Sequence, residues 1–150
     1  MDRSEKVILT NMCMVYDGGR VLVQHRVKPG WTGIAFPGGH VEKGESFTDS
    51  VIREIKEETN LTIEKPRMCG IKSWYTKEGN RYIILFYKTD KFSGELQSSE
   101  EGEVFWANVA DVPKMNLAYG FDDMLKVFLN DDLSEFYYYV EDGEWKHELK

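Results

Sequence analysis

Residues 39–61 have the sequence GHVEKGESFTDSVIREIKEETNL, in which a glycine-rich turn leads into a segment with helical periodicity. Ser46 is suited to cap a helix, and Asp49 follows three residues later in an arrangement like a capping box. The segment therefore predicts a helix over residues 46–59, preceded by a tight turn.

Three carboxylates gather on one side of the predicted helix. At about 100° per residue, Glu54, Glu57 and Glu58 fall within a sector of roughly 100°. This sector borders the apolar face, because Glu58 projects between Phe47 and Val51. Clustered acids on a half-buried face repel one another and favour a bound cation, and carboxylate oxygens suit Mg²⁺ or Mn²⁺. The alternative is an ordinary surface helix whose acids pair with neighbouring basic residues.

The turn before the helix has the spacing of a phosphate-binding P-loop without its chemistry. Gly39 and Gly44 are separated by four residues, as in that loop, and Ser46 falls at its hydroxyl position. Glu45 stands where the loop needs a lysine, and a carboxylate there repels phosphate. The charge at this position excludes a P-loop and leaves a glycine turn ahead of a carboxylate helix.

The fixed spacing of these residues resembles the signature of a known family, the Nudix box. The match consists of the following positions: Gly39-x5-Glu45-x7-Arg53-Glu54-Ile55-x-Glu57-Glu58-x-Asn60-Leu61. One position departs from the family pattern, since Asn60 stands where a glycine usually closes the helix in a left-handed conformation. Asparagine is the next most tolerant residue there, so the departure concerns helix termination more than chemistry. Residues 35–39, AFPGG, also resemble the usual entry to the box.

The resemblance implies hydrolysis of a nucleoside diphosphate linked to another group, with a divalent metal, Mg²⁺ or else Mn²⁺, as cofactor. The family's metal ligands map to four residues: Glu54, Glu57, Glu58 and, through its carbonyl, Gly38. Arg53 would orient and neutralise an adjacent glutamate. Glu45 would support the site by pairing with Arg53, and Gly39 would support it as the box glycine.

The resemblance leaves the catalytic base open between two acids. In the implied mechanism a carboxylate deprotonates a water that attacks phosphorus, while the metal offsets charge developing on the phosphates. Glu54 can be this base unless it is occupied as a ligand. Glu100 is the other candidate, because in many relatives an acid in a loop before a late strand reaches the metal site. The alternative interpretation of Glu100 is a solvated acidic loop over residues 97–103.

Two polar residues are candidates for binding substrate. Arg26, at the end of a predicted strand, resembles a basic residue that some relatives use on phosphate, and its alternative is a surface charge. Asn116 resembles an asparagine that recognises the base edge in relatives that cleave oxidised guanine nucleotides, since an amide both donates and accepts. Its alternative role is the N-cap of the following helix. Aromatic side chains offer either a stacking surface for a base or core packing: Phe36, Trp74, Tyr75, Tyr82 and Trp106.

The rest of the chain predicts a mixed β-sheet with two helices, an α/β or α+β fold. Apolar runs predict strands over residues 7–16, 20–26, 65–76, 81–88 and 103–109. A second helix is expected at about 119–129, and Asp142-Gly143 predicts the turn of a C-terminal hairpin. The resemblance implies an α/β/α sandwich around a mixed sheet, as one domain over residues 1–150.

Composition limits the classes of partner. The chain has 150 residues, with 19 basic and 26 acidic side chains and a formal net charge of −7. This excess of acid disfavours binding to nucleic-acid polymers, so a phosphate-bearing ligand needs a cation to neutralise it. No apolar run approaches the roughly 20 residues that span a bilayer. Cys13 and Cys69 are expected to be core thiols of a cytoplasmic protein.

These features predict a Mg²⁺-dependent hydrolase that cleaves a nucleoside triphosphate, such as 8-oxo-dGTP, to the monophosphate and pyrophosphate. Cleavage of ADP-ribose or another nucleoside diphosphate derivative is an alternative activity. A nucleotide-sensing module without catalysis is an alternative of another class, against which the complete set of box acids argues. The expected partner is a small nucleotide, with no membrane, and the protein is expected to be a monomer or a homodimer.

Overall fold

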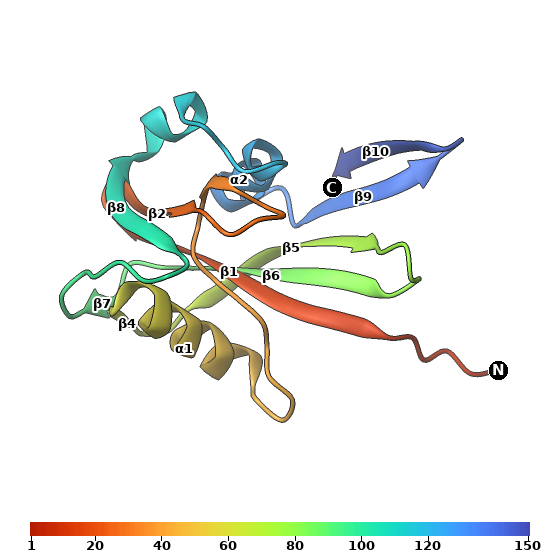
Figure 1. Cartoon of the computed structure of the whole chain (residues 1–150), viewed down its shortest axis with the longest axis horizontal. Coiled ribbons are helices and arrows are strands. Elements are labelled where there is room, and N and C mark those ends of the chain that lie inside the picture. Colours follow the sequence, from red (N-terminus) through yellow and green to blue (C-terminus); the bar gives the residue numbers. More distant parts are fainter.

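The computed structural model of the protein describes residues 1–150 as a mixed β-sheet with a helix on each face (Figure 1). The strands are β1 (Val7–Asp17), β2 (Arg20–Arg26), β3 (Gly33–Ala35), β4 (Thr62–Ile63), β5 (Arg67–Tyr75), β6 (Arg81–Thr89), β7 (Phe92–Ser93), β8 (Gly102–Asn108), β9 (Glu135–Glu141) and β10 (Glu144–Leu149). The helices are α1 (Phe47–Thr59), the 3₁₀ helix η1 (Val109–Lys114) and α2 (Phe121–Leu129). None of these helices has the length and apolar character needed to cross a membrane.

The main sheet combines parallel and antiparallel pairs. Its strand order is β10-β9-β5-β6-β1-β2-β3, and β8 pairs with β2 beside this path. β1 runs parallel to β6 and β5 runs parallel to β9, whereas the other pairs are antiparallel. β1 and β2 pair only next to their connecting turn, at Tyr16–Val21 and Asp17–Arg20. Beyond that turn, the edge of β1 opposite β6 is not paired with β2 and can bond to another segment of the chain.

The segment that carries the box glycines lies against β1. Asn11 N donates to Gly39 O at 2.8 Å, and Cys13 N donates to Pro37 O at 3.0 Å. A Cβ at Gly38 would meet the carbonyl oxygen of Asn11 at 2.1 Å, so this close approach requires glycine. The pairing fixes the backbone of the glycine turn beside an inner strand of the sheet.

Alternation along β1 divides the core into two layers. Met12 and Met14 belong to the apolar cluster that contains the α2 side chains, whereas Cys13 and Val15 belong to the cluster that contains the α1 side chains. Burial on both faces explains why the inner strands are nearly continuous apolar runs. With one helix on each face, the predicted α/β/α sandwich with a mixed sheet is confirmed (Figure 1).

Helix α1 forms where the sequence predicts it, except that Ser46 lies just outside as the cap. Ser46 Oγ accepts a hydrogen bond from Asp49 N at 3.0 Å. At the other end, Asn60 has a φ of 65° and donates its backbone N–H to Lys56 O at 3.0 Å. The left-handed closure expected at Asn60 is therefore confirmed.

The second helix differs from the prediction at its start. α2 begins at Phe121 rather than near Tyr119, and its N-cap is Gly120, with a φ of 81°. A segment without regular structure separates η1 from α2, and Asn116 lies in that segment. The alternative role of Asn116 as the helix N-cap is therefore wrong.

The C-terminal hairpin forms as predicted from its turn. β9 and β10 pair antiparallel, with Glu141 opposite Glu144 next to the turn. Asp142 and Gly143 have φ values of 53° and 79°, the left-handed conformation that suits this pair of residues. Because β9 also pairs with β5, the hairpin extends the main sheet beyond β5. Phe136 of β9 packs in the same apolar cluster as the side chains of α2.

Candidate active site

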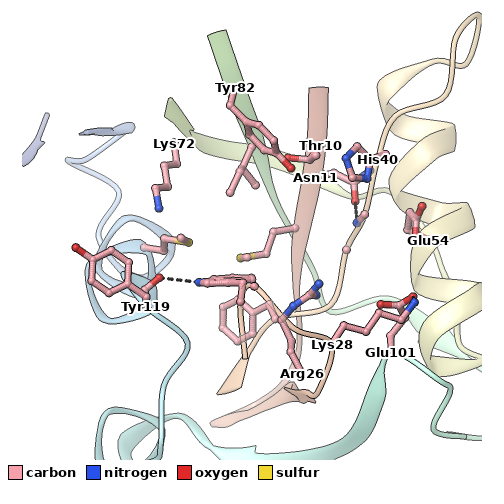
Figure 2. Close-up of a pocket in the computed structure, with 18 of the residues that line it drawn as sticks. Thr10, Asn11, Arg26, Lys28, His40, Glu54, Lys72, Tyr82, Glu101 and Tyr119 are labelled. Atoms are coloured by element: carbon pink, nitrogen blue, oxygen red, sulfur yellow. Dashed lines mark hydrogen bonds and ion pairs between the residues drawn. The ribbon is translucent and has the colours of Figure 1, made fainter. Parts of the chain in front are cut away.

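One cavity of about 730 Å³ extends from α1 to α2 and the C-terminal hairpin (Figure 2). Two α1 carboxylates, those of Glu54 and Glu58, line it together with Gly38 and Gly39. Much of the remaining lining is aromatic: Trp31, Phe36, Trp74, Tyr82, Tyr119, Tyr138 and Trp145. Figure 2 shows Glu54 and Tyr119 on opposite sides of the cavity, which therefore has an acidic side and an aromatic side.

Glu58 is deeply enclosed, with 4% of its surface exposed. Its carboxylate accepts hydrogen bonds from Gly38 N at 3.0 Å and from Gln24 Nε2 at 3.2 Å. Burial raises the pKa of Glu58 to about 7, and the nearby charge of Glu54 acts in the same direction. A cation beside this carboxylate would favour its ionised form.

Glu54 faces the cavity, and 13% of its side chain is exposed. Burial raises the pKa of Glu54, although Arg53 Nη1 donates to Glu54 Oε1 at 3.0 Å. Gly39 packs directly on this carboxylate, since a Cβ there would lie 2.3 Å from the carboxyl carbon of Glu54. The box glycine therefore makes the room in which the Glu54 side chain lies.

Arg53 connects the glycine turn to the carboxylates of α1. Its Nε and Nη2 donate to the two carboxylate oxygens of Glu45 at 2.7 and 2.9 Å, and Nη2 also donates to His40 O at 3.0 Å. The bidentate contact lowers the pKa of Glu45 to about 2. The structure thus contains the Arg53–Glu45 pair expected from the sequence, and Arg53 links this pair to Glu54.

Glu57 is placed differently from its two neighbours. Its side chain is 59% exposed, does not line the cavity, and pairs with Arg53 Nη1 at 3.2 Å. No group of three or more His, Cys, Asp or Glu side chains converges as a metal site, so the predicted ligand set of three glutamates is not assembled. Glu54 and Glu58 nevertheless fit a divalent cation, because they are two desolvated carboxylates on one cavity whose charges repel each other.

Arg26 lines the cavity rather than standing as a free surface charge. Its Nη1 donates to Gln24 Oε1 at 3.1 Å, and its guanidinium carbon lies 5.1 Å from the ring centre of Trp31. The Nε–H of Arg26 is buried and has no hydrogen-bond partner on the protein. A buried donor without an acceptor is costly, so this group is suited to an acceptor on a ligand, such as a phosphate oxygen.

The loop acid that lines the cavity is Glu101, and its neighbour Glu100 is exposed outside it. A turn fixes which of the two acids faces the cavity. In this turn Ser99 Oγ accepts a hydrogen bond from Glu101 N at 3.2 Å, and Ser99 O accepts one from Gly102 N at 3.1 Å. Glu101 forms an ion pair with Lys28, another lining residue (Figure 2). The structure therefore shifts the candidate base of this loop by one residue from the predicted Glu100.

The predicted substrate contacts are only partly brought together. Asn116 is exposed and does not line the cavity, and its carbonyl oxygen accepts from Ile34 N at 2.8 Å. Among the predicted aromatic residues, three line the cavity: Phe36, Trp74 and Tyr82. The other two, Tyr75 and Trp106, do not. The geometry therefore supports an aromatic surface for a base and gives no support to Asn116 as its recognition residue.

Sequence reasoning missed several polar lining residues, among them Lys28, Lys72, Glu101 and Tyr119. Lys28 and Tyr119 lie in connecting segments where no motif points to them. Lys72 had one signal, because on a strand it shares a face with Trp74, two residues on.

Known proteins are similar to this chain over most of its length. The sequence model of the NUDIX domain family matches residues 8–128. The uncharacterized Nudix hydrolase YvcI of Bacillus subtilis is 33% identical over 113 residues, which are 72% of this chain and 70% of that protein. The ADP-ribose pyrophosphatase of Methanocaldococcus jannaschii is 29% identical over 115 residues, 75% of this chain and 67% of that protein. The crystal structure of a mutator MutT protein from Bacillus halodurans has a TM-score of 0.79 at 29% identity, over 95% of this chain and 97% of that one.

Proposed function

Because the chain belongs to the Nudix hydrolase family, we propose that this pyrophosphohydrolase cleaves a nucleoside triphosphate to the monophosphate and pyrophosphate. The observation that carries the proposal is the cavity, where two desolvated carboxylates, Glu54 and Glu58, lie across from an aromatic lining. A phosphate chain with its cation suits the acidic side, and a flat base suits the aromatic side. The candidate substrates of this class include 8-oxo-dGTP.

Nudix hydrolases generally use a divalent metal such as Mg²⁺. We propose that Glu54 and Glu58 would hold Mg²⁺ or Mn²⁺. Glu57 and the Gly38 carbonyl, the further ligands expected from the sequence, stay predictions, because Glu57 lies outside the cavity. When bound, such an ion offsets charge on the phosphate oxygens and lowers the pKa of a bound water. The two enclosed carboxylates support this assignment, because each has its pKa raised by burial and would be stabilised as an anion by a cation.

Side chains of the cavity position the groups that react. Arg53 keeps Glu54 in place through the 3.0 Å contact, and Glu45 in turn fixes Arg53. Arg26 offers its free Nε–H to a phosphate oxygen. In the reaction the oxygen of water bonds to phosphorus, the bond from phosphorus to the bridging oxygen breaks, and a carboxylate takes the proton of the water. We propose Glu101 as the acid that takes that proton, because it lines the cavity, with Glu54 as the alternative base.

Replacing Glu101 with Gln is expected to lower kcat by about 100-fold, the order of magnitude that a general base contributes. Glu100→Gln is the matched control, since Glu100 is an exposed acid of the same loop and its loss should change kcat by less than about twofold. Steady-state kinetics at saturating nucleotide and Mg²⁺ measure both variants. If Glu100→Gln lowered kcat more than Glu101→Gln does, Glu100 would be the general base. If kcat were unchanged in both variants, Glu54 would be the base.

ADP-ribose is the second candidate substrate, because one relative of this chain is named ADP-ribose pyrophosphatase. Its diphosphate and adenine would use the same two sides of the cavity as a nucleoside triphosphate. Comparing the turnover of the two substrates distinguishes between them.

A panel of nucleotides tests the proposed function. It contains ordinary and oxidised nucleoside triphosphates, ADP-ribose and dinucleotides, each with Mg²⁺ and with a chelator, and the readout is released phosphate after phosphatase treatment. We expect a nucleoside triphosphate to be the best substrate and its turnover to vanish in chelator. Preference for ADP-ribose or a dinucleotide would establish the alternative activity. Binding without turnover of any of them would indicate a nucleotide-sensing module and contradict the proposal.

A further inference from the structure

A buried lysine on β5 lines the aromatic side of the cavity. Lys72 is 7% exposed, and in the sheet it pairs with Ile84 of β6 and Phe136 of β9. Lysine is almost never enclosed to this degree unless its ammonium has a partner. The question is therefore what partner the Lys72 ammonium is built to meet.

Aromatic rings surround the ammonium of Lys72. Its Nζ lies 4.8 Å from the ring centre of Trp74, 5.0 Å from that of Phe136 and 5.6 Å from that of Tyr138. Such rings stabilise a positive charge, but they do not replace a hydrogen-bond acceptor. The side-chain contacts of Lys72 Nζ are with these rings and include no hydrogen bond, so its three N–H donors are free for a ligand.

The charged neighbours of Lys72 do not neutralise it directly. Asp123 of α2 is the only acid whose charge acts on it, and that carboxylate already contacts Lys126 and His147, each at 3.2 Å. Gly120, the N-cap of α2, lies beside Nζ, which places the ammonium at the positive end of a helix. Burial lowers the pKa of Lys72 to about 8, which leaves the group protonated at neutral pH. The surroundings of Lys72 thus provide no hydrogen-bond acceptor close to Nζ.

The position of Lys72 indicates which part of a substrate would supply the acceptor. Figure 2 shows Lys72 near Tyr119, on the side of the cavity opposite Glu54. The proposed function places the reacting phosphates at Glu54. The part of a nucleotide that reaches the far side is then its base, enclosed by aromatic side chains.

We propose that Lys72 selects nucleotides by the edge of their base and favours keto bases over amino bases. This inference rests on the proposed function, since it requires a nucleotide in the cavity. Guanine, hypoxanthine, uracil and thymine present a carbonyl acceptor where adenine and cytosine carry an amino donor. The ammonium donates a hydrogen bond to a carbonyl. Opposite an amino group, two donors face each other and form no hydrogen bond. A buried site that leaves a polar group unpaired discriminates strongly against the wrong ligand.

Binding of five nucleoside monophosphates tests the inference without catalysis. Titration calorimetry of the wild-type protein with GMP, AMP, UMP and CMP gives two matched pairs that differ in the base edge. We expect GMP to bind at least about tenfold more tightly than AMP, and UMP more tightly than CMP by a similar factor. IMP against AMP is the sharpest comparison, because these two purines differ only along one edge, where hypoxanthine has the 6-carbonyl and N1–H and adenine has the 6-amino group and unprotonated N1.

The variant Lys72→Met removes the ammonium and keeps an apolar side chain of similar length. In this variant the dissociation constants within each keto and amino pair should differ by no more than about threefold. The binding of GMP and UMP should weaken, while that of AMP and CMP stays unchanged. Lys88→Met is the matched control, because Lys88 is a largely buried lysine of β6 outside this cavity, and it should keep the wild-type ratios. Thermal melting checks that both variants are folded.

Equal binding of keto and amino bases by the wild-type protein would overturn the inference, as would ratios that survive in Lys72→Met. Equal weakening of all four ligands in Lys72→Met would also overturn it, because a phosphate contact or a structural role produces that result. If Lys72→Met does not fold, the wild-type ratio of IMP to AMP decides alone. Hydrolysis of nucleotides without preference for the base sinks this inference and leaves the proposed function standing. Base-selective binding without hydrolysis supports this inference and contradicts the proposed function.

Discussion

The Glu54→Gln variant is expected to lose at least about 100-fold in kcat and to keep its fold. Glu54 faces the cavity, and the amide of Gln provides neither the negative oxygen that a divalent cation prefers nor a base for a proton. The loss should therefore appear in kcat with Mg²⁺ at saturation. This variant and the alanine variants of Gly38 and Gly39 are expected to have the largest effects in the molecule.

The stability of Glu54→Gln follows from the direction of the pKa shift. Burial raises the pKa of Glu54 above its ordinary value of 4.5, so the folded state binds the proton more tightly than the unfolded state. Folding stability then falls as the pH rises from that ordinary value through the pKa of the folded state. Gln removes this penalty. Without metal, the melting temperature of Glu54→Gln relative to the wild-type protein should be higher at about pH 8 than at about pH 4.

Asp49→Asn is the matched control for Glu54→Gln. Asp49 is an exposed acid on the same helix and does not line the cavity, so kcat should stay within about twofold of the wild-type value. Steady-state kinetics and thermal melts measure the three proteins side by side. Turnover by Glu54→Gln at the wild-type rate would show that the acidic side of the cavity does not hold the reacting groups.

Adding a methyl group at two neighbouring glycines should have opposite consequences. At Gly38 the new Cβ would lie 2.1 Å from the carbonyl oxygen of Asn11, which cannot move without disturbing β1. Gly38→Ala should therefore cost about 3 kcal/mol or more, and lower the melting temperature by roughly 10 °C in a chain of this size. At Gly39 the nearest atoms are those of the Glu54 carboxylate, the mobile end of a side chain.

Gly39→Ala should accordingly fold like the wild-type protein and fail in catalysis. Displacement of the Glu54 carboxylate should lower kcat by about as much as Glu54→Gln does, roughly 100-fold, with a change in melting temperature of about 2 °C or less. Melting curves and kinetics of the two alanine variants provide the comparison. Full activity in Gly39→Ala, or a normal melting temperature in Gly38→Ala, would contradict this reading of the glycine turn.

Local chemistry explains which parts of the fold were predictable. Ser46 and Asn60 act on backbone groups within one turn of the helix end, so their residue types alone indicate the boundaries of α1. The turn at Asp142 and Gly143 is equally local. The apolar runs likewise depend on each strand itself, and they correctly predicted a mixed sheet with two helices.

The features that the sequence does not reveal depend on contacts between distant segments. Which of two consecutive acids faces the cavity depends on the Ser99–Gly102 turn, and the sequence alone does not orient Glu101 and Glu100. The enclosure of Lys72 requires Phe136, which β9 brings from far along the chain. Glu57 is exposed and pairs with Arg53 outside the cavity, so periodicity alone gave three equivalent glutamates where the structure has two at the cavity.

The proposed activity is tested most directly by the identity of its products. The wild-type protein is incubated with GTP and Mg²⁺, and the phosphorus species are followed by NMR. We predict GMP and pyrophosphate in equal amounts, neither of them in the presence of chelator, and both formed at least about 100-fold more slowly by Glu54→Gln. GDP and inorganic phosphate as the products, or no cleavage of GTP or of 8-oxo-dGTP in a parallel incubation with Mg²⁺, would contradict the proposed function.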